Sequence, residues 1–186
     1  MAYLLGIDVG SGSARCGVFD EAASLVGVGV QAIAQHRPAP DHVEQSSEDI
    51  WSAICIAVKA ALREAGIEGA QVAALSYSAT CSLVLLDDAH QPLPLSEGET
   101  PWNIIMWMDH RATSETEEVN ATGSSVLHNL GGAMSVEMQI PKLMWIKRHR
   151  PDVWKRLGYA GDLADFLCFK STGTFKRSAC TLGCKW

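Results

Sequence analysis

Basic residues are scarce in this sequence. Its 186 residues include 15 Lys and Arg against 21 Asp and Glu, which gives a formal net charge of -6 at pH 7. A protein that binds nucleic acid needs a dense cationic face to neutralise the phosphate backbone, and this composition does not supply one. We therefore expect no nucleic-acid partner.

Long apolar runs are missing as well. The longer uncharged stretches, such as 70–86, are interrupted by polar residues, whereas a membrane-spanning helix needs about 20 mostly apolar residues. Asp8 follows the first residues too closely for a signal peptide. These absences predict a cytoplasmic chain without a membrane partner.

The six cysteines include no Cys-x-x-Cys pair, so neither a zinc cluster nor a disulfide framework is expected. Apolar residues make up 47% of the chain and charged residues 19%, which excludes intrinsic disorder. The length suffices for one large or two small domains with an ordinary core.

The first half of the chain predicts a sheet with one covering helix. Apolar runs at 3–9, 14–19 and 24–34 are separated by short turns, which favours antiparallel strands. A helix is expected from the cap Ser46 to Gly66. The strand expected at 72–76 then completes a crossover, which adds a parallel neighbour.

The second half reads as mainly helical after a further strand at 83–86. One helix is expected to begin at a capping box of Ser114 and Glu117, and another at Pro141. Asp162 is expected to cap the last helix, which ends near Gly173.

The turn after the first strand is the sharpest chemical feature. Asp8 lies near the end of that strand, at the rim of the sheet, where a carboxylate can hold a hydrated divalent ion. The small residues that follow let backbone N–H groups approach a phosphate: Gly10, Ser11, Gly12 and Ser13. The segment is neither a Walker A loop nor a dinucleotide fingerprint, because no Gly-Lys-Ser/Thr follows and the next element is a strand. A tight hairpin that favours glycine would explain the same residues without a ligand.

Several segments, in order along the chain, resemble the FGGY family of carbohydrate kinases. The hairpin at 6–15 resembles the first phosphate motif of the superfamily that joins sugar kinases, heat-shock chaperone ATPases and actin. Residues 107–112 (WMDHRA) are similar to the Trp-x-Asp-x-Arg segment of the FGGY family. Residues 141–145 (PKLMW) and 162–173 resemble the helices that follow in the family, and 177–186 (RSACTLGCKW) is similar to a segment of its ribulokinase-like branch.

This resemblance implies an α/β, ribonuclease H-like fold, with a mixed sheet that begins as an antiparallel meander, flanking helices, and an incomplete domain. Residues 1–186 would be the N-terminal sugar-binding portion of the kinase, with the C-terminal ATP-binding domain absent. The implied activity is ATP-dependent phosphorylation of a ketopentose or related polyol, with ATP and Mg²⁺ as cofactors.

The resemblance also implies roles for particular residues. Asp8 would hold the Mg²⁺ shell, and the turn at 10–13 would face the ATP phosphates. The candidates for the sugar pocket are Thr80, Cys81, Glu137 and Lys185. Some relatives carry a charged pair where Thr80 and Cys81 stand, and Asp109 and Arg111 are expected to form a supporting ion pair. Each sugar candidate also has a plain structural interpretation, as a polar strand end, a helix-start carboxylate or a solvated lysine.

The family's general base is an aspartate in a later glycine-rich segment, so no catalytic residue is expected before Trp186. The chain alone is therefore expected to be inactive, with an exposed apolar patch and a tendency to associate, for example as a homo-oligomer. The alternatives are a non-catalytic sugar- or nucleotide-binding module of the same fold and a chaperone- or actin-like ATPase segment. Residues 107–112 and the C-terminal segment weigh against the second alternative.

Overall fold

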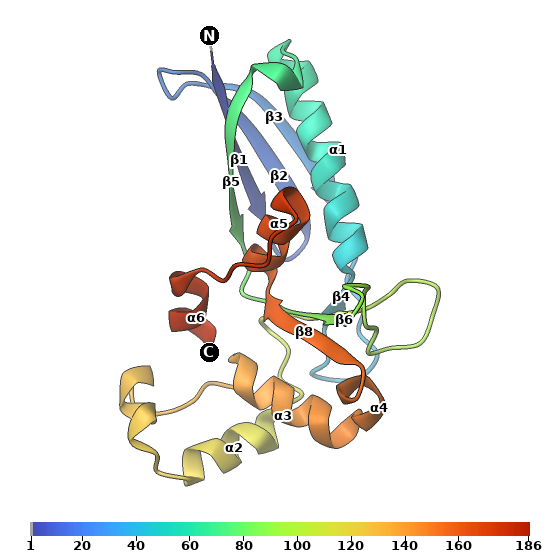
Figure 1. The fold of residues 1–186 in the computed structure, drawn as a ribbon, viewed down its shortest axis with the longest axis vertical. Helices are drawn as coiled ribbons and strands as arrows, with labels where there is room; N and C mark the ends of the chain where they lie inside the picture. The colour runs from blue at the N-terminus through green and yellow to red at the C-terminus, as the bar shows by residue number, and fades with distance from the viewer. Residues whose placement is uncertain (1) are drawn as a thin grey trace.

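The computed structural model describes residues 2–186 and contains two small sheets with helices beside them (Figure 1). The first sheet is mixed: its first three strands pair antiparallel, and its last strand lies parallel to the first. This confirms the predicted meander and crossover. Its order is β3 (Leu25–Ala32), β2 (Ser13–Phe19), β1 (Tyr3–Val9) and β5 (Val72–Ala79).

Helix α1 (Ser47–Ala65) covers one face of this sheet. As predicted, Ser46 caps its first turn by accepting a hydrogen bond from the Asp49 N–H, and Gly66 ends it in the left-handed conformation with φ 66°. The helix crosses β3 so closely that a Cβ at Gly29 would lie 1.9 Å from the Ala57 carbonyl oxygen. Glycine alone permits this approach.

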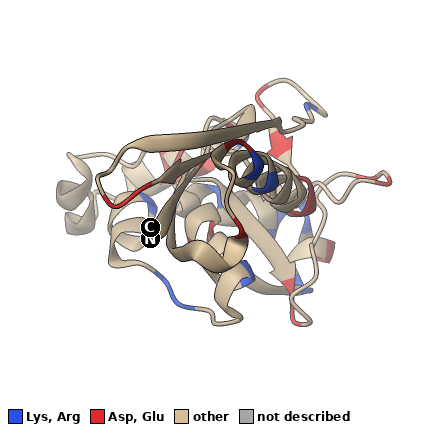
Figure 2. Ribbon diagram, turned by 90° about the horizontal axis from the view of Figure 1, so that it is seen from above, with Lys and Arg blue, Asp and Glu red and all other residues tan. Residues whose placement is uncertain are grey.

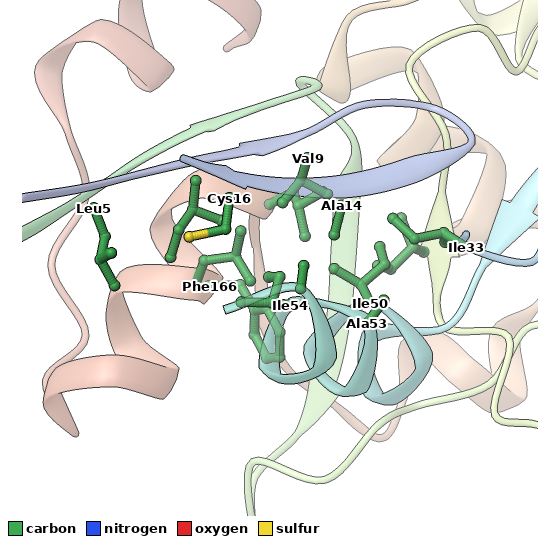
Figure 3. Packing of buried hydrophobic residues seen from close by; sticks show 14 of the residues in the cluster. Leu5, Val9, Ala14, Cys16, Ile33, Ile50, Ala53, Ile54 and Phe166 are labelled. Atoms are coloured by element: carbon green, nitrogen blue, oxygen red, sulfur yellow. The ribbon is translucent and has the colours of Figure 1, made fainter. Parts of the chain in front are cut away.

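The main core lies between the first sheet and the helices α1 and α5 (Leu163–Thr172). Figure 3 shows alternate side chains of the strands meeting the inner side of α1 and Phe166 of α5. Labelled members of this cluster are Leu5, Val9, Ala14, Cys16, Ile33, Ile50, Ala53, Ile54 and Phe166. The opposite face of β3 stays open, because its valines alternate with the glycines that face α1.

A second, antiparallel sheet was not anticipated as a separate unit. Only one of its four strands was predicted, the one at 83–86. Two of the others are only two residues long, which is too short to show an alternating pattern. Its order is β4 (Glu44–Gln45), β7 (Ile104–Ile105), β6 (Leu83–Asp87) and β8 (Leu157–Asp162).

The remaining helices lie mostly at the far end of the second sheet (Figure 1). They are α2 (Thr113–Ala121), α3 (Gln139–His149) and α4 (Pro151–Trp154), with a short 3-10 turn at Ser125–Leu130. Another 3-10 turn, Gly69–Gln71, connects α1 to β5. Pro141 stands in the first turn of α3, as predicted. The prediction of a capping box at Ser114 is wrong. Helix α2 begins at Thr113, whose hydroxyl donates to the His110 carbonyl, so Ser114 is already inside the helix.

Helix α5 is capped by Asp162 and ends at Gly173, both as predicted. It is not the last helix, because α6 (Ala179–Lys185) follows. The Asp165 carboxylate accepts hydrogen bonds from the Ser178 N–H at 2.9 Å and the Thr181 hydroxyl at 2.7 Å. These contacts with α5 hold α6 in place, and a local sequence pattern could not show them.

Charges are scattered over the molecule: Lys and Arg lie among Asp and Glu on helices and loops (Figure 2). Within residues 2–186, no helix has the length and apolar character that crossing a bilayer requires.

Candidate functional site

The turn between β1 and β2 is held from several sides. The Gly10 N–H donates to the Ser13 carbonyl at 3.0 Å, which closes the turn. The Ser11 carbonyl accepts the side-chain amides of Gln35 and Gln45, each at 2.9 Å. The Ser11 hydroxyl accepts the indole N–H of Trp107 at 3.0 Å.

The glycines of this turn are not required by its backbone conformation. Neither Gly10 nor Gly12 has a positive φ. A Cβ built on Gly12 would meet no atom within 4 Å. A Cβ at Gly10, by contrast, would lie 2.9 Å from Arg15 Nη2. The tight hairpin is present as the alternative interpretation expected, but a positive φ is not what selects its two glycines.

Asp8 precedes the turn on β1, with its side chain half exposed. Its carboxylate forms an ion pair with Arg15 at 2.8 Å. Among residues 2–186 no group of three or more His, Cys, Asp or Glu could enclose a metal ion. Mg²⁺ keeps several waters and is commonly bound by one or two carboxylates plus substrate phosphates, so a single exposed aspartate fits one position in its shell.

Three of the four sugar candidates meet beside this turn. A cavity of about 160 Å³ is lined by Ala79, Thr80, Cys81, Trp107 and Lys185. The Thr80 N–H donates to the Val9 carbonyl at the end of β1, so the end of β5 is tied to the strand that leads into the turn. Trp107 therefore belongs both to the cavity and, through its indole N–H, to the turn.

The fourth candidate, Glu137, reaches the cavity through Lys185. One carboxylate oxygen of Glu137 lies 3.7 Å from the Lys185 ammonium, and the other lies 3.7 Å from His110 Nε2. The Lys185 side chain is 17% exposed, so the interpretation as a freely solvated lysine does not hold. The contact of His110 with Glu137 was missed, since nothing near His110 in the sequence suggests it.

Cys81 is a poor nucleophile in this position. Burial, with a smaller contribution from the nearby Asp162 carboxylate, raises the pKa of the Cys81 thiol to about 11. It therefore stays protonated at neutral pH and contributes a weakly polar wall to the cavity.

A buried ion cluster supports the Trp107 segment. The Arg111 guanidinium binds Asp109 at 2.8 Å and Glu44 at 2.9 Å, and all three side chains are almost completely buried. The predicted pair of Asp109 and Arg111 is confirmed. Its third member, Glu44, was missed because 67 residues separate it from Arg111.

Residues 3–181 match the N-terminal domain of the FGGY family of carbohydrate kinases. The chain belongs to this family. It is 46% identical to an FGGY carbohydrate kinase domain-containing protein of Homo sapiens, over 99% of this chain and 33% of the relative. It is 37% identical to a D-ribulokinase of Saccharomyces cerevisiae, over 98% of this chain and 26% of that protein. The chain thus spans about a third or less of the length of these relatives.

Solved structures of a xylulose kinase and a glycerol kinase show the same fold. A ligand-bound xylulose kinase from Lactobacillus acidophilus superposes with a TM-score of 0.79 at 21% identity, over 94% of this chain and 34% of that one. Plasmodium falciparum glycerol kinase with ADP gives a TM-score of 0.72 at 16% identity, over 93% and 35%. These neighbours confirm the expected ribonuclease H-like α/β architecture, present here as a partial domain. Carbohydrate kinases of this family use ATP as the phosphoryl donor.

Lys142 belongs to the segment 141–145 that resembles the FGGY family, but its contact with the Trp107 segment was not predicted. Its fully buried ammonium donates to the carbonyls of Met106 at 2.7 Å and Trp107 at 3.2 Å. Burial lowers the pKa of Lys142 to about 8. A lysine in the apolar run Pro-Lys-Leu-Met-Trp-Ile was the available signal, because a lysine is rarely buried without a partner.

Asp162, the last residue of β8, is close enough to the cavity residue Cys81 to raise its pKa. One of its carboxylate oxygens caps α5 by accepting the Ala164 N–H at 3.1 Å, and the other has no hydrogen-bond partner in the described part of the chain. Burial raises the pKa of Asp162 to about 6, against a smaller lowering by the Ala164 N–H.

Proposed function

We propose that this chain provides the sugar-binding side and the first phosphate turn of an ATP-dependent kinase that phosphorylates a ketopentose or related polyol. The hydrogen bond from the Trp107 indole to the Ser11 hydroxyl carries the proposal. It joins the wall of a small cavity directly to a turn that suits a phosphate, which is the juxtaposition that phosphoryl transfer to a bound hydroxyl needs. The similarity to a D-ribulokinase supports the choice of a five-carbon ketose.

On the sugar side, Lys185 and Glu137 offer a donor and an acceptor for sugar hydroxyls. Their 3.7 Å separation is longer than a direct hydrogen bond, which leaves the donors of one and the acceptors of the other available to a ligand. Thr80 and Cys81 form the remaining wall with Trp107.

On the phosphate side, the residues proposed to contact the ATP phosphates are Gly10, Ser11, Gly12 and Ser13. Asp8 would hold Mg²⁺ through one carboxylate oxygen, and the ion would supply charge neutralisation on the phosphates. The same carboxylate forms the 2.8 Å ion pair with Arg15.

The proposal places the general base and the ATP-binding domain outside residues 1–186, which form the sugar-binding portion. A cytoplasmic location and the absence of nucleic-acid and membrane partners belong to the same proposal.

Ligand-dependent protection against thermal unfolding tests the sugar site. D-Ribulose, other ketopentoses and polyols are titrated against the chain, and a binding sugar is expected to raise Tm in proportion to ln(1 + [L]/Kd). In Lys185→Ala, sugar binding is expected to weaken by about 1–3 kcal/mol, the cost of a lost charged hydrogen bond.

Arg63→Ala, in the last turn of α1, is the control for removing a basic residue without changing the cavity. If no ketopentose or polyol shifts Tm, or if Lys185→Ala binds as well as the unmodified chain, the sugar site is wrong. Sugar binding without turnover in a longer form of the protein would instead favour the non-catalytic module.

A further inference from the structure

Two cysteines that lie far apart in the sequence meet beside the cavity. Cys81 follows the end of β5 and lines the cavity, while Cys184 lies in the last turn of α6, next to the cavity residue Lys185. The side chain of Cys184 is in hydrogen-bonding contact with the Cys81 thiol, and both cysteines are free. A disulfide needs the two Cβ atoms within about 4.5 Å, so thiols that are already in contact can be joined with little movement.

The two thiols differ in their access to solvent. Cys184 is exposed, whereas Cys81 is partly buried. Burial keeps the Cys81 thiol protonated at neutral pH, because it raises the pKa of this thiol to about 11. A dissolved oxidant therefore reaches Cys184 first, and Cys81 is placed to react with the product.

The hydrogen bonds that attach α6 to α5 leave the Cys184 end of the helix as the place where a covalent link would matter. The Asp165 carboxylate holds α6 through the Ser178 N–H and the Thr181 hydroxyl, both at the start of the helix. Cys184 lies at the opposite end. A bond from Cys184 to Cys81 would therefore fix the second end of α6 to the end of β5.

We propose that Cys81 and Cys184 form a redox-sensitive pair, which a peroxide converts to a disulfide beside the cavity. In the first step the Cys184 thiolate sulfur attacks a peroxide oxygen and the O–O bond breaks. The departing hydroxide takes up the proton that the thiol released, which gives water and a sulfenic acid on Cys184. In the second step the Cys81 sulfur attacks the Cys184 sulfur, the S–O bond breaks, and the leaving hydroxide takes the Cys81 proton. One hydrogen peroxide is thus reduced to two waters while the two thiols lose two electrons.

The link would also alter the cavity, an effect that rests on the proposed function. Cys81 forms one part of the cavity wall, and Lys185, the residue next to Cys184, forms another. The disulfide would draw the end of α6 toward Cys81 and fix the backbone of Lys185, whose ammonium is proposed to bind sugar. Oxidation is therefore expected to weaken sugar binding, and reduction is expected to restore it.

Peptide mapping after oxidation tests the cysteine pair. The reduced chain is treated with hydrogen peroxide, its remaining thiols are alkylated, and its tryptic peptides are compared by mass spectrometry with and without dithiothreitol. The peptide that contains Cys81 is expected to be joined to the peptide 178–185, and dithiothreitol should separate the two. Because 178–185 also contains Cys180, the same map is made for Cys180→Ser and Cys184→Ser.

Cys180→Ser is the matched control for Cys184→Ser. Cys180 is also an exposed cysteine of α6, one turn earlier, and it lines the groove beside β5 instead of the cavity. Cys180→Ser should form the link as the unmodified chain does, and Cys184→Ser should not. The pair is overturned if the unmodified chain shows no such link, if Cys180→Ser abolishes the link, or if Cys184→Ser retains it.

The shift in Tm caused by a ketopentose tests the effect on the cavity. Peroxide should abolish this shift in the unmodified chain and leave it in Cys184→Ser, and dithiothreitol should restore it. A link that forms without loss of the shift would overturn the effect on sugar binding. If no sugar shifts Tm even in the reduced chain, the proposed function is contradicted, while the peptide map still decides whether the cysteine pair exists.

Discussion

At the scale of single residues, this chain buries several charges close to its cavity, and each is stabilised by a different set of partners. Arg111 has two carboxylates, so its charge is compensated. Lys142 has only carbonyl oxygens, and Asp162 has one backbone N–H. Burial of a charge without a full counter-charge favours the neutral form, which explains the shifts of the pKa of Lys142 and Asp162.

Asp162 should make stability depend on pH. Its pKa is raised from 3.8 to about 6 in the folded chain, so its contribution to stability is present below pH 3.8 and is lost as the pH rises through about 6. Asp162→Asn keeps an oxygen for the α5 cap but cannot ionise. Relative to the unmodified chain, the free energy of unfolding of this variant should rise by about 1–3 kcal/mol between pH 4 and pH 7.

Urea unfolding at several pH values measures this difference. Asp87→Asn is the control, because Asp87, the last residue of β6, also accepts backbone N–H groups. If the free energies of unfolding of Asp162→Asn and the unmodified chain differ by the same amount from pH 4 to pH 7, the raised pKa of Asp162 is contradicted.

The metal role of Asp8 predicts a change in catalysis with little change in stability. In an active kinase that contains this chain, Asp8→Asn should lower kcat by about a hundredfold or more, because the metal that neutralises the phosphates loses its anchor. The exposed ion pair with Arg15 contributes less than about 1 kcal/mol, so Tm should hardly change. Steady-state kinetics with a melting curve tests both statements, and near-normal turnover would remove Asp8 from the metal site.

At the scale of elements, the contact between α1 and β3 depends on two glycines of the strand. At Gly27 and Gly29 an added Cβ would meet backbone atoms of α1 at 2.4 and 1.9 Å, which a rotamer change cannot relieve. The helix would have to move away from the sheet, and the core between them would open.

Gly29→Ala is therefore expected to destabilise the chain by at least about 3 kcal/mol. Gly69→Ala is the matched control, because a Cβ there meets nothing within 4 Å. Chemical denaturation of both variants measures the effect, and equal stabilities would show that α1 does not pack as described.

At the scale of the whole molecule, Trp107 connects the turn at 10–13 to the cavity, and the proposed function uses the two together as one side of an active site. Phosphoryl transfer requires a base and the donor nucleotide to be held in line with the acceptor hydroxyl, and the proposed function places both outside residues 1–186. We expect the purified chain to release no sugar-dependent ADP with ATP, Mg²⁺ and a panel of ketopentoses and polyols. A coupled assay against a sugar-free blank measures this, and ADP release above the blank would show that the base lies within these residues.

The sequence by itself determined the features that depend on neighbouring residues. The meander, the caps at Ser46 and Asp162, the helix ends at Gly66 and Gly173 and the turn at 10–13 are each encoded in a few consecutive positions. Local sterics and backbone hydrogen bonding decide such features, so a pattern of residues is enough to predict them.

Only the tertiary structure decided which distant residues share a surface. The link from Trp107 to Ser11 spans 96 positions, and that from Arg111 to Glu44 spans 67. The strands β4 and β7 exist only because they pair with each other and with β6. Two residues cannot form a stable strand alone, and a buried charge is tolerated only where folding brings its partner to it, so neither could be read from the order of residues along the chain.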